Sequence, residues 1–120
     1  MTDFDEIVTN IVESSQGAIA AAIMAYDGVP LAEYKKSESE IDISTMSIEY
    51  MDVLKEIKSA SEVLEAGTME EITVRSDELV FIVRLINEEF FLALILTPDG
   101  NCGKGRYLTR IAAPKVAEAV

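Results

Sequence analysis

The fold is decided by residues 18–35, which have the sequence AIAAAIMAYDGVPLAEYK. The nearly unbroken apolar run from Ala18 to Ala25 predicts a strand covered on both faces, although its alanines leave a helix as the rival interpretation. Asp27-Gly28 is a strong hairpin signal, and Pro30 lacks the N–H donor that a central strand position needs. We therefore expect a hairpin whose returning strand, Leu31 to Lys35, lies at the edge of a sheet.

Three further strands are predicted in the second half of the chain. Within Glu70 to Arg75, Ile72 and Val74 alternate with polar neighbours, which is typical of an edge strand. Leu79 to Ile86 and Phe90 to Leu96 are continuous apolar runs, which implies that helices cover both faces of the sheet.

Two terminal helices are predicted from apolar residues at helical spacing. The first begins at a capping box formed by Thr2 and Asp5 and ends near Gly17. The last contains Leu108, Ile111, Ala112 and Val116, and we expect Pro114 to kink or divide it.

The longest predicted helix begins at Asp42 or Ser44 and ends at Gly67, a residue suited to a C-terminal stop. One apolar stripe of this helix is expected to lie on the sheet. Ile48 and Met51 fall outside that stripe, on a flank expected to face solvent, and favour a second contact surface. The stripe comprises Ile43, Met46, Tyr50, Val53, Leu54, Ile57, Ala60 and Leu64.

Composition narrows the classes of function. The 120 residues suit a single domain, 1–120, and 22 acidic against 10 basic side chains give a formal charge of −12. Such a charge repels phosphate backbones and anionic lipid headgroups, so nucleic acid and membranes are not expected partners. Cys102 is the single cysteine and no apolar run is long enough to span a membrane, so we expect a cytoplasmic location.

Candidate catalytic and cofactor sites are mostly excluded. The chain has no His, and neither its Cys102 nor its adjacent carboxylates form a familiar catalytic or metal-binding pattern. Gly100, Gly103, Lys104 and Gly105 suggest a phosphate-binding loop, but Pro98 and Gly105 stand where that motif needs Gly and Ser or Thr. We expect no catalytic residue, no metal and no cofactor, and favour a protein that acts by binding other proteins.

The elements are expected in the order helix, hairpin, long helix, three strands, helix, with Asp27-Gly28-Val29-Pro30-Leu31-Ala32 at the first turn. Later landmarks are Gly67 with Met69-Glu70-Glu71-Ile72, and Asn101-Cys102-Gly103-Lys104-Gly105-Arg106-Tyr107-Leu108 at the start of the last helix. In order and spacing, these motifs resemble the roadblock / dynein light chain family over nearly the whole chain. A free-standing acidic domain of this size is similar to the MglB-type bacterial proteins that pair with a Ras-like GTPase.

The resemblance implies an α/β (α+β) fold, a three-layer α/β/α sandwich of the profilin-like roadblock type. Its five-stranded antiparallel sheet would have the strand order 2-1-5-4-3. The long helix would cover one face of this sheet, and the two terminal helices the other.

The resemblance also implies a homodimer that pairs the third strand with its copy and packs the long helices side by side. Such pairing would remove the exposed sheet edge. The two long helices would then form a platform for the GTPase, and by position this platform includes Met51, Lys55, Lys58, Ser59 and Glu62. The expected dimer interface comprises Ile48, Met51, Glu70, Glu71, Ile72, Thr73, Val74 and Arg75.

The function implied is that of a non-catalytic regulator that binds a Ras-like small GTPase of the MglA type and modulates its GTP hydrolysis or nucleotide exchange, in a process such as cell polarity or motility. No arginine falls on the expected platform, which agrees with a partner that orients the GTPase's own residues rather than inserting an arginine. A scaffold dimer without effect on nucleotide turnover is the alternative, and a small-ligand sensor is ranked last.

Overall fold

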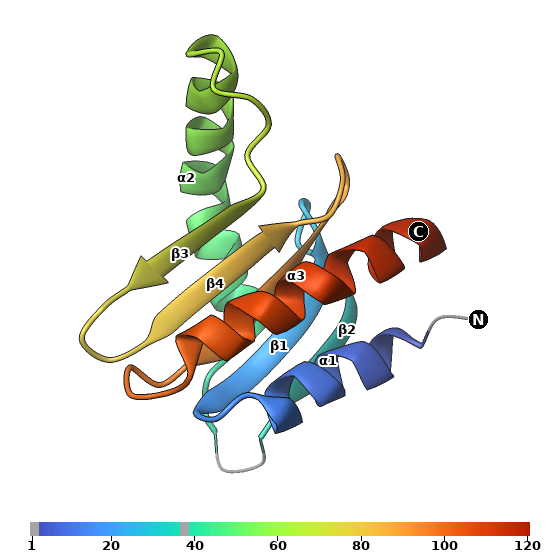
Figure 1. Ribbon diagram of the computed structural model, residues 1–120, viewed down its shortest axis with the longest axis vertical. Helices are drawn as coiled ribbons and strands as arrows, with labels where there is room; N and C mark the ends of the chain where they lie inside the picture. Colours follow the sequence, from blue (N-terminus) through green and yellow to red (C-terminus); the bar gives the residue numbers. More distant parts are fainter. Residues whose placement is uncertain (1–2, 37–38) are drawn as a thin grey trace.

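The computed structural model describes residues 3–36 and 39–120 of the chain (Figure 1). The boundaries agree with the predicted strands to within one residue at each end. The elements are α1 (Phe4–Ser14), β1 (Ala18–Ala25), β2 (Pro30–Lys35), α2 (Ile43–Val63), β3 (Glu71–Arg75), β4 (Val80–Leu85), β5 (Phe90–Leu96) and α3 (Cys102–Ala119).

The five strands form one sheet with the order β2-β1-β5-β4-β3, and every neighbouring pair is antiparallel. This confirms the predicted strand order. The alanine-rich segment Ala18–Ala25 is a strand, not the rival helix, and lies between β2 and β5. The register between β1 and β2 shifts at Ile23 and Met24, so this pairing contains an irregularity close to the hairpin turn.

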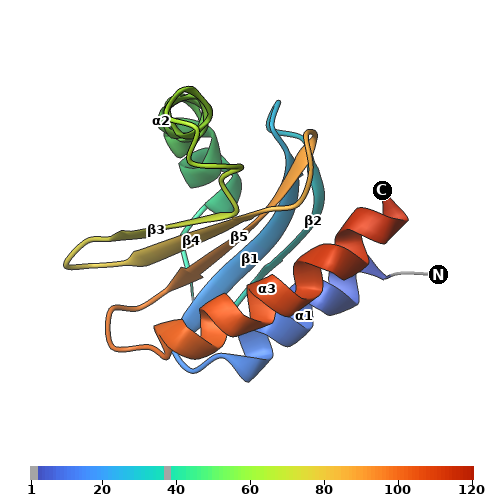
Figure 2. The same ribbon diagram turned by 45° about the horizontal axis from the view of Figure 1, so that its top comes forward.

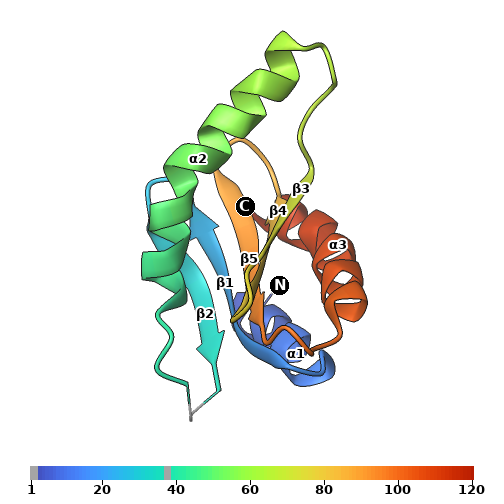
Figure 3. The ribbon, with the colours of Figure 1, turned by 90° about the vertical axis from the view of Figure 1, so that its left-hand side faces the viewer.

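The sheet is covered on both faces, as the continuous apolar strands predict. Figures 2 and 3 show α1 and α3 on one face and α2 on the other. One apolar cluster lies under α1 and α3 and includes Val12, Ile82 and Val116, while a second lies on the α2 side and includes Met24, Phe81 and Phe91. Among the described residues, no helix is both long and apolar enough to cross a bilayer.

The starts of α1 and α2 are set by acidic caps. The side chain of Asp3 accepts hydrogen bonds from the backbone N–H groups of Asp5 and Glu6, and Asp42 accepts one from Thr45 N–H. Thr2, half of the predicted capping box, lies outside the described residues. The hydrogen bond from Thr45 shows that Asp42, and not Ser44, caps α2.

One predicted helix end needs correction, and one of the two effects expected of Pro114 does not occur. α2 ends at Val63 instead of continuing to Gly67, because Leu64 caps it and Glu65 already has a positive φ of 55°. Gly67, with φ of 90°, turns the connection towards β3. In contrast, α3 is a single element from Cys102 to Ala119, and Pro114 does not divide it.

Candidate partner-binding surface

The sheet-facing side of α2 differs from the prediction. The residues of α2 that are buried are Ile43, Ser47, Met51 and Leu54, which follow at intervals of four, four and three. The prediction that Met51 faces solvent is wrong, since its side chain is 4% exposed and packs in the cluster on the α2 side of the sheet. A residue buried in this way cannot offer its side chain to a partner.

A second group of α2 residues, predicted to face the sheet, is exposed instead. Val53, Ile57 and Leu64 were expected on the sheet, but Val53 is 52% exposed and Leu64 is 76% exposed. They follow Tyr50 at helical spacing, and Tyr50 stacks on Phe81 of β4 with 5.0 Å between ring centroids. This apolar flank of α2, defined by Val53, Ile57 and the C-cap residue Leu64, therefore lies on the side of the helix that faces β4 and β3.

The apolar flank continues past the sheet. α2 packs against β1 and β5, and Figures 1 and 3 show its C-terminal half running beyond the end of the strands. Ile72 and Val74 of β3 are only half-buried against the cluster on the same side of the sheet. Exposed apolar side chains of α2 and half-buried apolar side chains of the edge strand thus lie on the same side of the sheet.

The other flank of α2 carries the expected platform residues. Lys55, Ser59 and Glu62 are exposed and share one line along the helix. Ile48 begins this line and lies over the hairpin turn, since a Cβ added at Gly28 would be 3.2 Å from Ile48 Cδ1. The structure therefore places Ile48 on the flank away from β3.

Lys58 departs from the other platform residues because it turns towards the sheet. Its ammonium group lies 3.1 Å from a carboxylate oxygen of Glu88 and 5.7 Å from the centroid of the Tyr26 ring. Burial, with a smaller contribution from Glu88, raises the pKa of Tyr26 to about 12. The Tyr26 hydroxyl thus stays protonated at neutral pH, and Lys58 holds α2 against the two turns.

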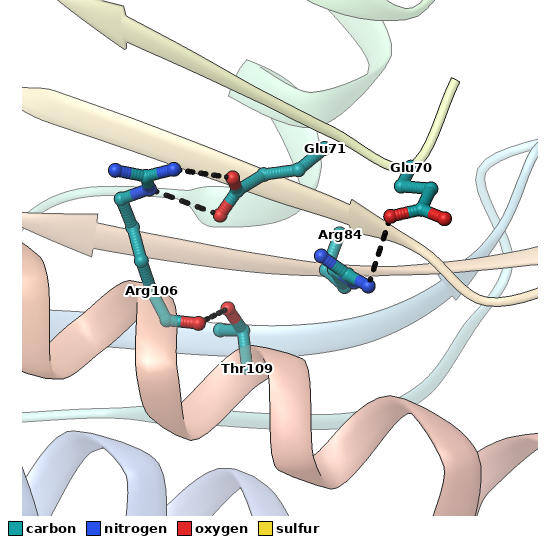
Figure 4. A network of polar contacts seen from close by, with 5 residues as sticks. All are labelled: Glu70, Glu71, Arg84, Arg106 and Thr109. Carbon is teal, nitrogen blue, oxygen red and sulfur yellow. Dashed lines mark hydrogen bonds and ion pairs between the residues drawn. The ribbon is translucent and has the colours of Figure 1, made fainter.

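The edge strand β3 is tied to α3 by an ion pair (Figure 4). Arg106 donates to both carboxylate oxygens of Glu71, over 3.1 and 2.8 Å. The bond from Arg106, followed by its charge and those of Arg84 and Arg110, holds the pKa of Glu71 below its ordinary range. Glu71 is thus ionised at neutral pH, and β3 is fixed relative to α3.

The glycine-rich segment forms the entry to α3. Asn101 caps the helix by accepting from Lys104 N–H, and Cys102 is its first residue, partly buried against the core. Within the part of the chain that the structure describes, no three His, Cys, Asp or Glu residues are grouped so that they could hold a metal ion.

The structure is thus an α/β/α sandwich in which α2 extends past the strands and β3 is an open edge strand. Neither a protein-family model nor a curated protein matches the chain, but solved structures do. MglC from Myxococcus xanthus is 36% identical, with 98% of each chain covered and a TM-score of 0.69. A Roadblock/LC7 domain from Streptomyces avermitilis is 14% identical, with 98% of each chain covered and a TM-score of 0.84.

The gliding protein MglB from Thermus thermophilus is 15% identical over 98% of this chain and 91% of its own, with a TM-score of 0.79. The chain belongs to the roadblock/LC7 (dynein light chain) family. Its sheet order and layers are those of the profilin-like roadblock fold.

Proposed function

We propose that the protein is a cytoplasmic homodimer that binds a Ras-like small GTPase and modulates its nucleotide cycle without a catalytic residue of its own. The observation that carries this proposal is the exposed apolar flank of α2 beside the open edge of β3. Exposed apolar side chains of this kind are unfavourable in water, and a second copy packed against them would cover them.

The dimer would join the two β3 strands and pack the two α2 helices. β3 pairs with β4 over five successive residues, Glu71 to Arg75, so its outer edge is regular and suited to a further antiparallel strand. In this interface Val53, Ile57 and Leu64 of α2 replace Ile48 and Met51, which lie on the far flank and in the core. Val53, Ile57 and Leu64 could not be assigned from the sequence because they share the spacing of the sheet-facing residues.

The GTPase would dock on the outward line of α2 formed by Lys55, Ser59 and Glu62. Two observations support a regulator that orients the GTPase's own residues over one that inserts a catalytic arginine. All four arginines, at positions 75, 84, 106 and 110, lie outside α2, and the fold is shared with MglB. A partner of this kind would hold the switch residues of the GTPase in their reactive arrangement.

Solution mass and GTP turnover test the proposal. We expect a dimer at micromolar concentration, and a changed rate of GTP hydrolysis or nucleotide release by a Ras-like GTPase encoded beside this chain. The double variant Lys55→Glu/Glu62→Lys should lose the effect on the GTPase and remain dimeric, while Lys35→Glu on β2 serves as the control.

Two results would count against this proposal, the first in part and the second as a whole. A stable dimer that leaves hydrolysis and exchange unchanged would favour a scaffold that brings proteins together without acting on the nucleotide. A chain that stays monomeric and binds no GTPase would contradict the proposal as a whole.

A further inference from the structure

The arginines of this acidic chain are gathered on one side of the molecule. All four belong to β3, β4 or α3: Arg75, Arg84, Arg106 and Arg110. α3 carries four basic residues and one carboxylate, Glu118, which gives it a formal charge of +3. Because the whole chain has a charge of −12, the residues outside α3 together carry −15. The molecule is therefore strongly polarised, with its cations concentrated on α3 and the adjoining strands.

A hollow lies between these elements. α3 packs on β4 and β5 (Figure 2), and the hollow borders the face of β3 on the α3 side. The hollow has a volume of about 220 Å³, and we call it the arginine groove. It is lined by Glu71, Arg84, Gly103, Arg106, Tyr107 and Arg110.

The positive charges of the arginine groove are only partly balanced from within the chain. Arg106 is neutralised by Glu71, but the guanidinium of Arg110 lies 5.5 Å from the centroid of the Tyr107 ring, a stacking contact that leaves its charge in place. The ion pair of Arg84 is longer than that of Arg106, with 3.6 Å between its guanidinium and a carboxylate oxygen of Glu70, and the side chain of Glu70 is 75% exposed.

Arg84 is also incompletely hydrogen-bonded. The side chain of Arg84 is only 18% exposed, and among the described residues its buried Nε atom has no acceptor. A cation held in a half-buried position without full compensation is unfavourable unless a further anion approaches it.

We propose that the arginine groove binds a carboxylate-rich segment of a protein partner. Guanidinium groups bind carboxylates through paired hydrogen bonds, as Arg106 and Glu71 already do in this groove. The half-exposed ring of Tyr107 lines the site and offers apolar contact to the stems of acidic side chains. The charge of −15 on the rest of the chain opposes a long phosphate backbone, so an acidic peptide fits better than nucleic acid.

The site is separate from the proposed GTPase platform. The arginine groove lies on the α3 side of the sheet, since α3 contributes four of its lining residues, whereas α2 lies on the other face (Figures 2 and 3). One molecule could therefore hold both partners at once. The inference does not depend on the proposed function, because it rests on α3, β3 and β4 alone.

Fluorescence anisotropy with the intact protein tests the inference. The probe is a short labelled peptide rich in glutamate, compared with a glutamine peptide of the same length and with a phosphoserine peptide. We expect the glutamate peptide to bind, with an affinity that falls as salt is added, and the glutamine peptide not to bind. Binding of the phosphoserine peptide alone would overturn the choice of occupant, and binding of neither anionic peptide would overturn the site.

Matched charge variants locate the binding. Arg110→Glu should weaken the glutamate peptide roughly tenfold or more, and Arg110→Gln by less, because a bound carboxylate loses an ionic partner. Lys35→Glu makes the same change of net charge on the exposed edge of β2 and should alter binding less than about twofold. Equal weakening by Arg110→Glu and Lys35→Glu would show attraction to charge in general and contradict the groove. Unchanged melting temperature and solution mass confirm that each variant stays folded.

Discussion

Glu71 joins two parts of the molecule that have few other contacts. Its carboxylate is bound through both oxygens by Arg106 of α3, and the Thr109 hydroxyl donates to the Arg106 carbonyl at 3.0 Å (Figure 4). β3 has β4 as its single strand neighbour within the described residues. This ion pair therefore fixes the edge strand that the proposed dimer uses.

The pKa of Glu71 predicts how stability depends on pH. Because the pKa is lowered in the folded state, the pair contributes its full stability above the ordinary pKa of Glu and loses it as the pH falls through the lowered value. Glu71→Gln should reduce the free energy of unfolding by roughly 1 kcal/mol at neutral pH and by much less in acid. Urea unfolding at both pH values measures this, with exposed Glu78→Gln as the control. An equal loss at both pH values would contradict it.

Gly105 lies where α3 comes closest to the sheet. A Cβ at this position would be 2.9 Å from Leu94 Cδ2, whereas at Gly103 the nearest atom is 3.7 Å away. We expect Gly105→Leu to destabilise the protein by about 1–3 kcal/mol because the core must shift. Gly103→Leu should change stability by less than about 0.5 kcal/mol, and chemical unfolding compares the two. Equal effects would show that the approach of α3 is not limiting.

At the scale of elements, the start of α2 could be predicted from the sequence and its buried face could not. Its start at Asp42 follows from local capping chemistry. Its buried face does not follow, because Ser47 lies in the core with 0% exposure while Val53 lies outside. Apolar residues occur on two flanks of this helix, and the spacing alone does not tell which flank meets the sheet and which meets a partner.

The apolar flank of α2 predicts a pair of contrasting variants. Ile57→Glu should weaken dimerisation roughly tenfold or more, because a charge would be buried between subunits. Val63→Glu is the matched control, since Val63 is 82% exposed and lies on another side of the helix. Analytical ultracentrifugation of both variants measures the dissociation constants. Equal dissociation constants would remove the apolar flank from the interface.

At the scale of the whole molecule, most of the architecture could be predicted. The strands, the antiparallel order and the helix layers follow from apolar periodicity, from the Asp27-Gly28 turn and from the family landmarks. The surfaces could not be predicted equally well. The arginine groove depends on β4 and α3 meeting in space, and Arg84 and Arg106 are 22 positions apart in the sequence with no local pattern linking them.

Net charge gives the two proposed interactions opposite responses to salt. Two copies that each carry −12 repel one another, so raising sodium chloride from about 50 mM to about 500 mM should tighten the dimer by screening that repulsion. The acidic peptide should bind more weakly over the same range. Sedimentation and anisotropy at matched salt concentrations measure both responses, and a shared direction would contradict the charge argument.

The two margins of the sheet are unequal, and this difference determines how far assembly can proceed. β2 begins with Pro30, carries the exposed charges of Glu33 and Lys35, and pairs with β1 through an irregular register. Each of these features discourages the addition of another strand. A sheet extended through β3 would therefore have a β2 strand at each end, and neither β2 favours the addition of a further strand. Assembly would stop at the pair and not continue into fibres.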